Sequence, residues 1–219
     1  MMLLAVFERA ALMLMTLFFL TRTRPFQRLF QKRDHTPAEL VLVASIFGLF
    51  AVFSTYTGIP VEGALINVRI IAIISGGILF GPWVGIPAGV ISGLHRYLID
   101  MDGHTSIPCL IASIIAGLLA TWLHLRCRKS RLWLYGILAG MLCEGLTMLL
   151  IWLLTEPHEV GVEIVSHIAY PMIAGALCIG LIIKLVQDLD DEKELIAAKQ
   201  AKLALDIANQ TLPFFQNID

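Results

Sequence analysis

The residues from Asn67 to Tyr97 constrain the fold more than any other stretch of the chain. The run reads NVRIIAIISGGILFGPWVGIPAGVISGLHRY, is largely apolar, and carries Arg69 and Arg96 near its two ends. As a single helix it would measure roughly 46 Å, which exceeds a hydrocarbon core of about 30 Å. Pro82 interrupts the run, and glycine recurs at every fourth position, namely Gly77, Gly81, Gly85, Gly89 and Gly93. The folding of this run therefore decides where the two arginines lie.

The composition predicts an all-α, polytopic membrane protein. Of the 219 residues, 58% are hydrophobic and 15% are charged, and the mean hydropathy is +0.80. A soluble domain carries about 25% charged residues. Several long apolar runs are typical of spanning helices, and the alternating ten-residue segments of a membrane β-barrel do not occur. The net charge of −1 gives no support for a nucleic-acid partner.

The cysteines and the known phosphate motifs indicate no catalytic or cofactor chemistry. The four cysteines form no CxxC pair and no cluster with histidine (Cys109, Cys127, Cys143 and Cys178). This pattern predicts neither a disulfide framework nor a metal site. No GxGxxG or Walker-type loop is present, so no nucleotide cofactor is expected.

Two basic segments set the predicted topology. TRTRPFQRLFQKRDH and LHLRCRKSRLW are rich in arginine and lysine, and the positive-inside rule places both in the cytoplasm. An even number of crossings must then separate them. Besides the central run, we expect spans at roughly 3–21, 39–57, 106–125, 132–154 and 164–186. The acidic segment EPHEVGVE between the last two spans is expected outside.

Charge parity predicts that the central run is a short, Gly-rich helical hairpin. A single crossing would give three spans between the basic segments, whereas a hairpin turning at Phe80–Trp83 gives four. Pro82 disfavours helical geometry at the residue before it, and Gly81 suits a turn. The run then supplies short spans at roughly 64–80 and 83–98. The result is about seven spans, with the N-terminus outside and the C-terminus inside.

The composition changes after the last predicted span. We expect a transmembrane domain at 1–186 and a charged cytoplasmic helix at 187–219, which Pro213 ends. Leu189, Ile196 and Leu203 recur at seven-residue spacing, but Glu192 and Lys199 occupy companion positions. The helix either pairs in a homodimer or is a solvated amphipathic tail. A helix of this kind is expected to lead to an output domain.

The predicted topology gathers polar residues near the outer membrane surface. Arg69 and Arg96 lie near the outer ends of the two short spans, and Cys109 and Ser113 begin the next span one turn apart. Asn67 and His95 lie at a similar depth. We find no acidic residue at this depth in these three spans. The two arginines therefore favour a site for a small carboxylate, which a guanidinium holds through two parallel hydrogen bonds.

Structural roles for the same arginines stand beside this prediction. An arginine near the interface also reaches out to lipid headgroups. The pair alternatively neutralises acids that the topology places outside, namely Glu8, Glu62, Asp100 and Asp102. Glu144, in the middle of the span at 132–154, either pairs with an arginine, relays protons or stays uncharged. His167 and Tyr170 either line a cavity or bond between helices.

The central run, followed by TSIPCLIASIIAG, resembles the LytS-type membrane sensor domain of bacterial histidine kinases. The similarity covers nearly the whole chain. LLAVFERAALML near the start and AKQAKLALDIANQTLP near the end resemble the pyruvate-responsive members of enterobacteria.

The resemblance implies a receptor in the bacterial inner membrane that binds pyruvate or a related small carboxylate from the periplasm. Such domains precede GAF and kinase regions, act as homodimers and signal to a LytTR-type response regulator, so this chain itself would have no kinase chemistry. In pyruvate-sensing members two arginines, a cysteine and a hydroxyl recognise the ligand. They match Arg69, Arg96 and Cys109, whereas the hydroxyl position falls on Ala112, with Ser113 next along.

Two other functions compete with the receptor. Short spans broken by glycine and proline also occur in transporters, so one alternative is a small-carboxylate transporter or its substrate-binding component. The other is a dimerisation module without a ligand.

Overall fold

The computed structural model describes residues 36–61, 64–66, 68–127 and 131–216, together with single positions among residues 1–23. Most of the predicted first span and of the first basic segment lies outside the described residues, as does Asn67. The chain divides into two compact units, Met1–Lys184 and Leu185–Asp219.

The described residues form helices and one short antiparallel ribbon. The ribbon pairs Ile59 with Ile66, and both are β-branched residues of the type that favours strands. The helix α3 begins with a capping box in which Thr36 and Glu39 bond each other's backbone N–H groups. In chain order the elements are α3 (Pro37–Tyr56), β1 (Ile59–Val61), β2 (Ala64–Ile66), α4 (Arg69–Phe80), α5 (Pro82–Ile99), α6 (Ser106–Arg126), α7 (Leu132–Leu154) and α8 (His158–Gln216).

Four of these helices lie where the sequence predicted spans. The boundaries of α3, α5, α6 and α7 differ from the predicted ones by at most two residues. Other boundaries were wrong. Residues 64–66 form a strand, so the helix predicted from 64 begins only at Arg69, and residues 158–163 belong to α8 instead of a loop. The helix α8 also continues past Pro213 to Gln216, because a proline in the last turn removes few backbone hydrogen bonds.

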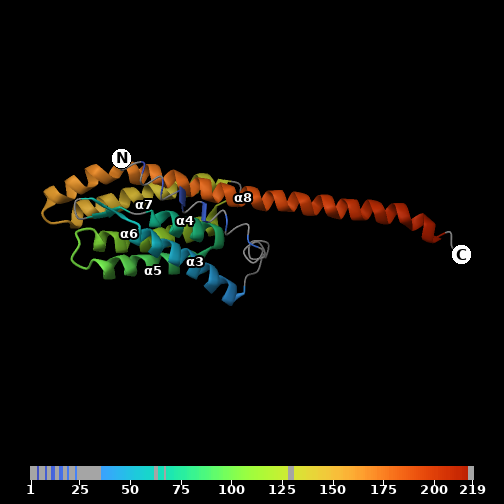
Figure 1. Ribbon diagram of the computed structural model, residues 1–219, viewed down its shortest axis with the longest axis horizontal. Coiled ribbons are helices and arrows are strands. Elements are labelled where there is room, and N and C mark those ends of the chain that lie inside the picture. Colours follow the sequence, from blue (N-terminus) through green and yellow to red (C-terminus); the bar gives the residue numbers. More distant parts are fainter. Residues whose placement is uncertain are drawn as a thin grey trace. The chain divides into compact units, whose positions relative to one another are not determined.

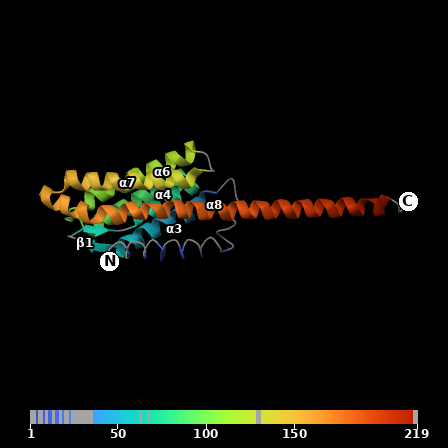
Figure 2. The ribbon, with the colours of Figure 1, turned by 90° about the horizontal axis from the view of Figure 1, so that it is seen from above.

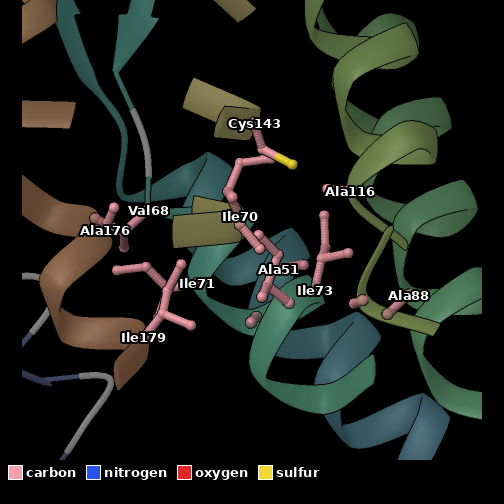
Figure 3. Close-up of a cluster of buried hydrophobic side chains, with 14 of the residues drawn as sticks. Ala51, Val68, Ile70, Ile71, Ile73, Ala88, Ala116, Cys143, Ala176 and Ile179 are labelled. Carbon is pink, nitrogen blue, oxygen red and sulfur yellow. The ribbon is translucent and has the colours of Figure 1, made fainter. Parts of the chain in front are cut away.

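Helix α4 is the centre of the first unit. Eleven of its twelve residues are buried, so it has no exposed face. Figure 3 shows its isoleucines among small side chains of the surrounding helices, with Ala51 from α3, Ala88 from α5, Ala116 from α6 and Ala176 from α8. Small neighbours of this kind let several helices approach one buried helix closely.

Glycines set the spacing around α4. A Cβ added at Gly77 would lie 3.0 Å from the Cα of Gly85, and one at Gly85 would lie 2.8 Å from the Cα of Gly77. A Cβ at Gly89 would lie 2.5 Å from the backbone oxygen of Ser113. Gly81 joins α4 to α5 with a φ of 79°, which only glycine adopts easily. Glycine thus brings α5 against both α4 and α6.

Side-chain hydrogen bonds show which helix ends lie together. The Val68 N–H donates to the Ser54 hydroxyl at 2.9 Å, and the Thr155 hydroxyl donates to the His104 carbonyl at 3.3 Å. The C-terminal ends of α3 and α7, the start of α4 and the α5–α6 loop therefore share one end of the bundle, which we call the arginine end. The α5–α6 loop lies on the left in Figure 1, and Figure 2 shows the bundle from above.

Among the described residues, four helices are long and apolar enough to cross a membrane: α3, α6, α7 and α8. The helix α4 is apolar but has only 12 residues, about 18 Å of helix. Large apolar side chains such as Leu49, Trp122, Leu142 and Trp152 point out of the bundle, as lipid contact requires. The count of seven spans stays a prediction.

Candidate anion-binding site

Arg69, the first residue of α4, is buried and held against α6. Only 2% of the residue is exposed. Its Nε–H donates to the Ser113 hydroxyl at 3.0 Å, and its Nη2 donates to the Cys109 carbonyl at 3.3 Å. The Ser113 hydroxyl donates to the same carbonyl at 2.7 Å. These three bonds fix the guanidinium beside the first two turns of α6.

Arg96, near the end of α5, is completely buried and has an internal counterion. Its Nη1 and Nη2 donate to Oδ2 of Asp100 at 3.1 and 3.2 Å, and Nη2 also donates to the Thr105 hydroxyl at 3.0 Å. The Asp100 side chain is 35% exposed. The sequence placed no acid at this depth inside the spans, but Asp100, just beyond one of them, supplies it. Arg96 is therefore paired with one of the acids that the neutralisation alternative named.

The α5–α6 loop is built around the Asp100 side chain. The Ser106 hydroxyl donates to the Asp100 carbonyl, and a side chain at Gly103 would overlap the Asp100 carboxylate. The Ser106 N–H donates to the Gly103 carbonyl at 3.0 Å. A movement of the Asp100 carboxylate would therefore displace Gly103 and, through it, Ser106, the first residue of α6.

The two arginines contact successive turns of the same helix end. Arg96 bonds Thr105, whose carbonyl accepts the Cys109 N–H at 3.0 Å, and Arg69 bonds Cys109 and Ser113. Four residues of helix rise about 6 Å. The structure thus brings four of the predicted site residues together at the arginine end: Arg69, Arg96, Cys109 and Ser113.

The remaining predicted site positions differ from these four. The His95 ring is half-buried and meets the Tyr56 ring of α3 edge-on, with centroids 5.2 Å apart. Asn67 lies outside the described residues. Ala112 is buried and offers no hydroxyl.

Glu144 is a buried acid on α7. Only 4% of Glu144 is exposed, and its Oε2 has no hydrogen-bond partner among the described residues. Pairing with an arginine, proton relay and an uncharged carboxyl all stay open for Glu144. His167 and Tyr170 are exposed on α8, so the expectation that they line a cavity or bond between helices was wrong.

Some buried polar atoms at this end have no hydrogen-bond partner among the described residues. On α5 these atoms are Nε of Arg96, Nδ1 of His95 and the hydroxyl of Ser92. Ser92 and Arg96 are one helical turn apart. Sequence reasoning missed Ser92, because a serine within an apolar helix gives no signal of its own. Within the described part of the chain, no group of three or more His, Cys, Asp or Glu residues is placed to hold a metal ion.

The chain is similar to membrane sensor proteins of bacteria. The family described as 5TMR of 5TMR-LYT matches residues 23–189. The chain is 59% identical over 218 residues to the sensor histidine kinase YpdA of Escherichia coli K12, with 100% of this chain and 39% of that protein covered. It is 31% identical over 233 residues to the sensor protein LytS of Bacillus subtilis 168, covering 95% and 38%.

A further relative extends the group. The sensor histidine kinase BtsS of Escherichia coli K12 is 29% identical over 215 residues, covering 95% of this chain and 38% of that protein. The chain spans about two fifths of the length of the curated relatives it matches. No solved structure matches it.

Proposed function

This chain belongs to the 5TMR of 5TMR-LYT family, and we propose that it is the membrane sensor region of a two-component histidine kinase that binds a small carboxylate at Arg69 and Arg96. The matched relatives are named as sensor proteins or sensor histidine kinases. Kinase activity and a response-regulator partner, of the LytTR type, belong to the complete protein.

The observation that carries the ligand site is the pair of buried guanidiniums at the start of α6. A buried cation needs a compensating anion, and Arg96 has one in Asp100, whose side chain is one-third exposed. A ligand carboxylate can take the place of this internal one on Nη1 and Nη2. Asp100 can then turn toward solvent without leaving a buried charge.

Exchange of carboxylates at Arg96 also offers a route for the signal. Asp100 is enclosed by the loop that leads into α6, and Thr105 shares Nη2 of Arg96 with it. A ligand that binds better when this loop has moved would shift the equilibrium toward that arrangement. Pyruvate or a related small carboxylate is the proposed ligand, with Cys109 beside Arg69.

The proposed topology puts the arginine end at the periplasmic face of the bacterial inner membrane. The chain would cross seven times, with the N-terminus outside and the C-terminus inside. The hydrogen bonds that hold several helix ends together at the arginine end support this arrangement, because the charge pattern places the same ends outside. The last span would then pass the signal to the cytoplasmic part of α8.

The second unit is proposed to pair in a homodimer. In α8, Ile196 and Leu203 are seven residues apart and are 47% and 61% exposed. Exposed apolar residues at heptad spacing are suited to a partner helix.

Calorimetric titration of the purified chain in lipid nanodiscs tests the proposed site. We expect pyruvate to bind the native protein and to bind Arg69→Ala and Arg96→Ala at least about tenfold more weakly, since each loses hydrogen bonds from a charged group. Arg126→Ala is the matched control, because Arg126 is exposed at the other end of α6. Unchanged affinity in both site variants would exclude these arginines as the ligand site.

A small-carboxylate transporter is the second candidate. The break at Gly81 between the two short helices α4 and α5 favours it, since broken helices line substrate sites in transporters. Uptake of labelled pyruvate into proteoliposomes that depends on this chain would support transport, and binding without uptake would support the receptor.

A further inference from the structure

The hydroxyl of Ser92 is buried without a partner, which is unusual for a serine within a helix. Ser92 is completely buried, and its Oγ has no hydrogen-bond partner among the described residues. Two other buried serines donate to the carbonyl four residues earlier: Ser75 to Ile71 at 2.5 Å, and Ser113 to Cys109 at 2.7 Å. Buried polar groups without a partner are rare and costly, so each calls for a physical explanation.

The packing of α4 on α5 places Ser92 at the level of Arg69. The two helices are joined at Gly81 and meet where Gly77 packs on Gly85. Ile70 precedes Gly77 by seven residues, and Ser92 follows Gly85 by seven. Because every helical residue adds the same rise, Ser92 lies across from the first turn of α4, which begins with Arg69.

The neighbours of Ser92 along α5 connect it to both arginines. A Cβ at Gly93 would lie 3.3 Å from the Cβ of Ser113, whose hydroxyl holds Arg69. In the other direction, Arg96 follows Ser92 by one turn on the same buried face, and its Nε–H also has no partner among the described residues. The unsatisfied hydroxyl of Ser92 therefore lies one turn from Arg96 and next to the residue that packs on Ser113.

The hydroxyl on α6 is already engaged. The Ser113 hydroxyl donates its only proton to the Cys109 carbonyl and accepts a hydrogen bond from Arg69, so it positions that arginine. Ala112 has no hydroxyl. The Ser92 hydroxyl, in contrast, has no hydrogen-bond partner of any kind among the described residues, so its proton is available.

We infer that Ser92 is a specificity-determining residue of the carboxylate site. Its hydroxyl donates to the oxygen on carbon 2 of a 2-oxo or 2-hydroxy carboxylate, while the ligand carboxylate takes the Nη groups that now hold Asp100. The oxygen on carbon 2 has free lone pairs and accepts this hydrogen bond. The inference rests on the proposed function and adds the ligand class that the site prefers.

Pyruvate and propionate test this role, because both are three-carbon carboxylates and only pyruvate has an oxygen on carbon 2. The dissociation constants of both acids are measured by calorimetry for the native chain, Ser92→Ala and Ser75→Ala. We expect Ser92→Ala to weaken pyruvate binding by about threefold to tenfold and propionate binding hardly at all. Its melting temperature should not fall, since the variant removes an unsatisfied hydroxyl.

Ser75→Ala is the matched control, because Ser75 is equally buried but its hydroxyl is bonded within α4. It should leave the ratio of the two affinities unchanged. Ser92→Cys is the second variant, should Ser92→Ala fail to fold, and it should reduce the ratio because a thiol is a weak donor.

Two results would overturn the inference, and they are distinguishable. If the native chain binds both acids but the affinity ratio is the same in the Ser92 variants, Ser92 has no role in recognition and the proposed carboxylate site stands. If the native chain binds neither acid, the proposed function fails as well.

Discussion

At Arg96, an internal carboxylate and an incoming one would compete for the same two nitrogen atoms. The Asp100 pair is partly exposed, so solvent screens it and its contribution to stability is small. A ligand can replace a partly exposed counterion at a small cost in free energy. Two fully buried partners would have to be separated against a large desolvation penalty.

Asp100→Asn is therefore expected to strengthen carboxylate binding. The variant removes the competing charge. Ion pairs that solvent screens at one partner contribute about 1 kcal/mol, so the dissociation constant for pyruvate should fall by up to about fivefold. Asp102→Asn is the matched control, because Asp102 is an exposed neighbour in the same loop. Weaker binding by Asp100→Asn in calorimetry would instead show that Asp100 holds Arg96 in its binding position.

The contacts of individual side chains were the least predictable feature from the sequence. The sequence indicated four of the site residues, namely Arg69, Arg96, Cys109 and Ser113. Charged residues are rare in apolar spans, and an even number of crossings between the basic segments brings the ends of these spans to the same side of the membrane. The pairing of Arg96 with Asp100 was one of the alternatives, and the four-residue spacing of the two fits a helix. The sequence did not show which of the four candidate acids would pair, because that depends on the path of the loop around Gly103. Ser92 carries no charge, so only its burial and its missing partner mark it.

At the scale of elements, close backbone contact between α5 and α6 holds the arginine end in place. A Cβ at Gly89 would meet the Ser113 backbone oxygen at 2.5 Å, and a backbone atom within a helix cannot move aside alone. The sequence predicted that the glycines let two arms of a hairpin pack together. Gly77 and Gly85 do approach each other, whereas Gly89 and Gly93 contact α6.

Gly89→Ala is expected to lower the stability of the folded bundle. The added methyl group forces α5 away from α6, and overpacking of this kind costs about 1–3 kcal/mol. The measurement is the melting temperature of the purified protein in detergent. Gly145→Ala is the control, because a Cβ there meets nothing within 4 Å, and it should melt like the native chain. Equal melting temperatures for the two variants would contradict the close contact.

The helix boundaries were predictable where an apolar run ended in charged or polar residues. That rule placed α6 and α7 within one residue. It failed at β2, because Ala64, Leu65 and Ile66 are as apolar as a span, and at the start of α8, where a few acidic residues do not prevent a helix. Hydropathy records the preference for lipid and not the backbone conformation.

At the scale of the whole molecule, the topology is the claim with the clearest test. In a variant whose own cysteines are replaced by alanine, Asp102→Cys and Trp83→Cys place one thiol in the α5–α6 loop and one beside Gly81. Both positions are exposed, with Trp83 at 70%. A membrane-impermeant maleimide should label the first in intact cells and the second only in inside-out vesicles. Labelling of both from the same side would exclude seven spans.

Recognition of a carboxylate charge by buried guanidiniums is central to the proposed function. The most direct measurement is a calorimetric comparison of pyruvate and methyl pyruvate on the native chain in nanodiscs, because the ester keeps the carbon skeleton and loses the charge. We expect pyruvate to bind and the ester to bind at least about a hundredfold more weakly, since charge-assisted hydrogen bonds are the strong ones. Equal affinity for the two compounds would contradict recognition of the carboxylate charge by Arg69 and Arg96.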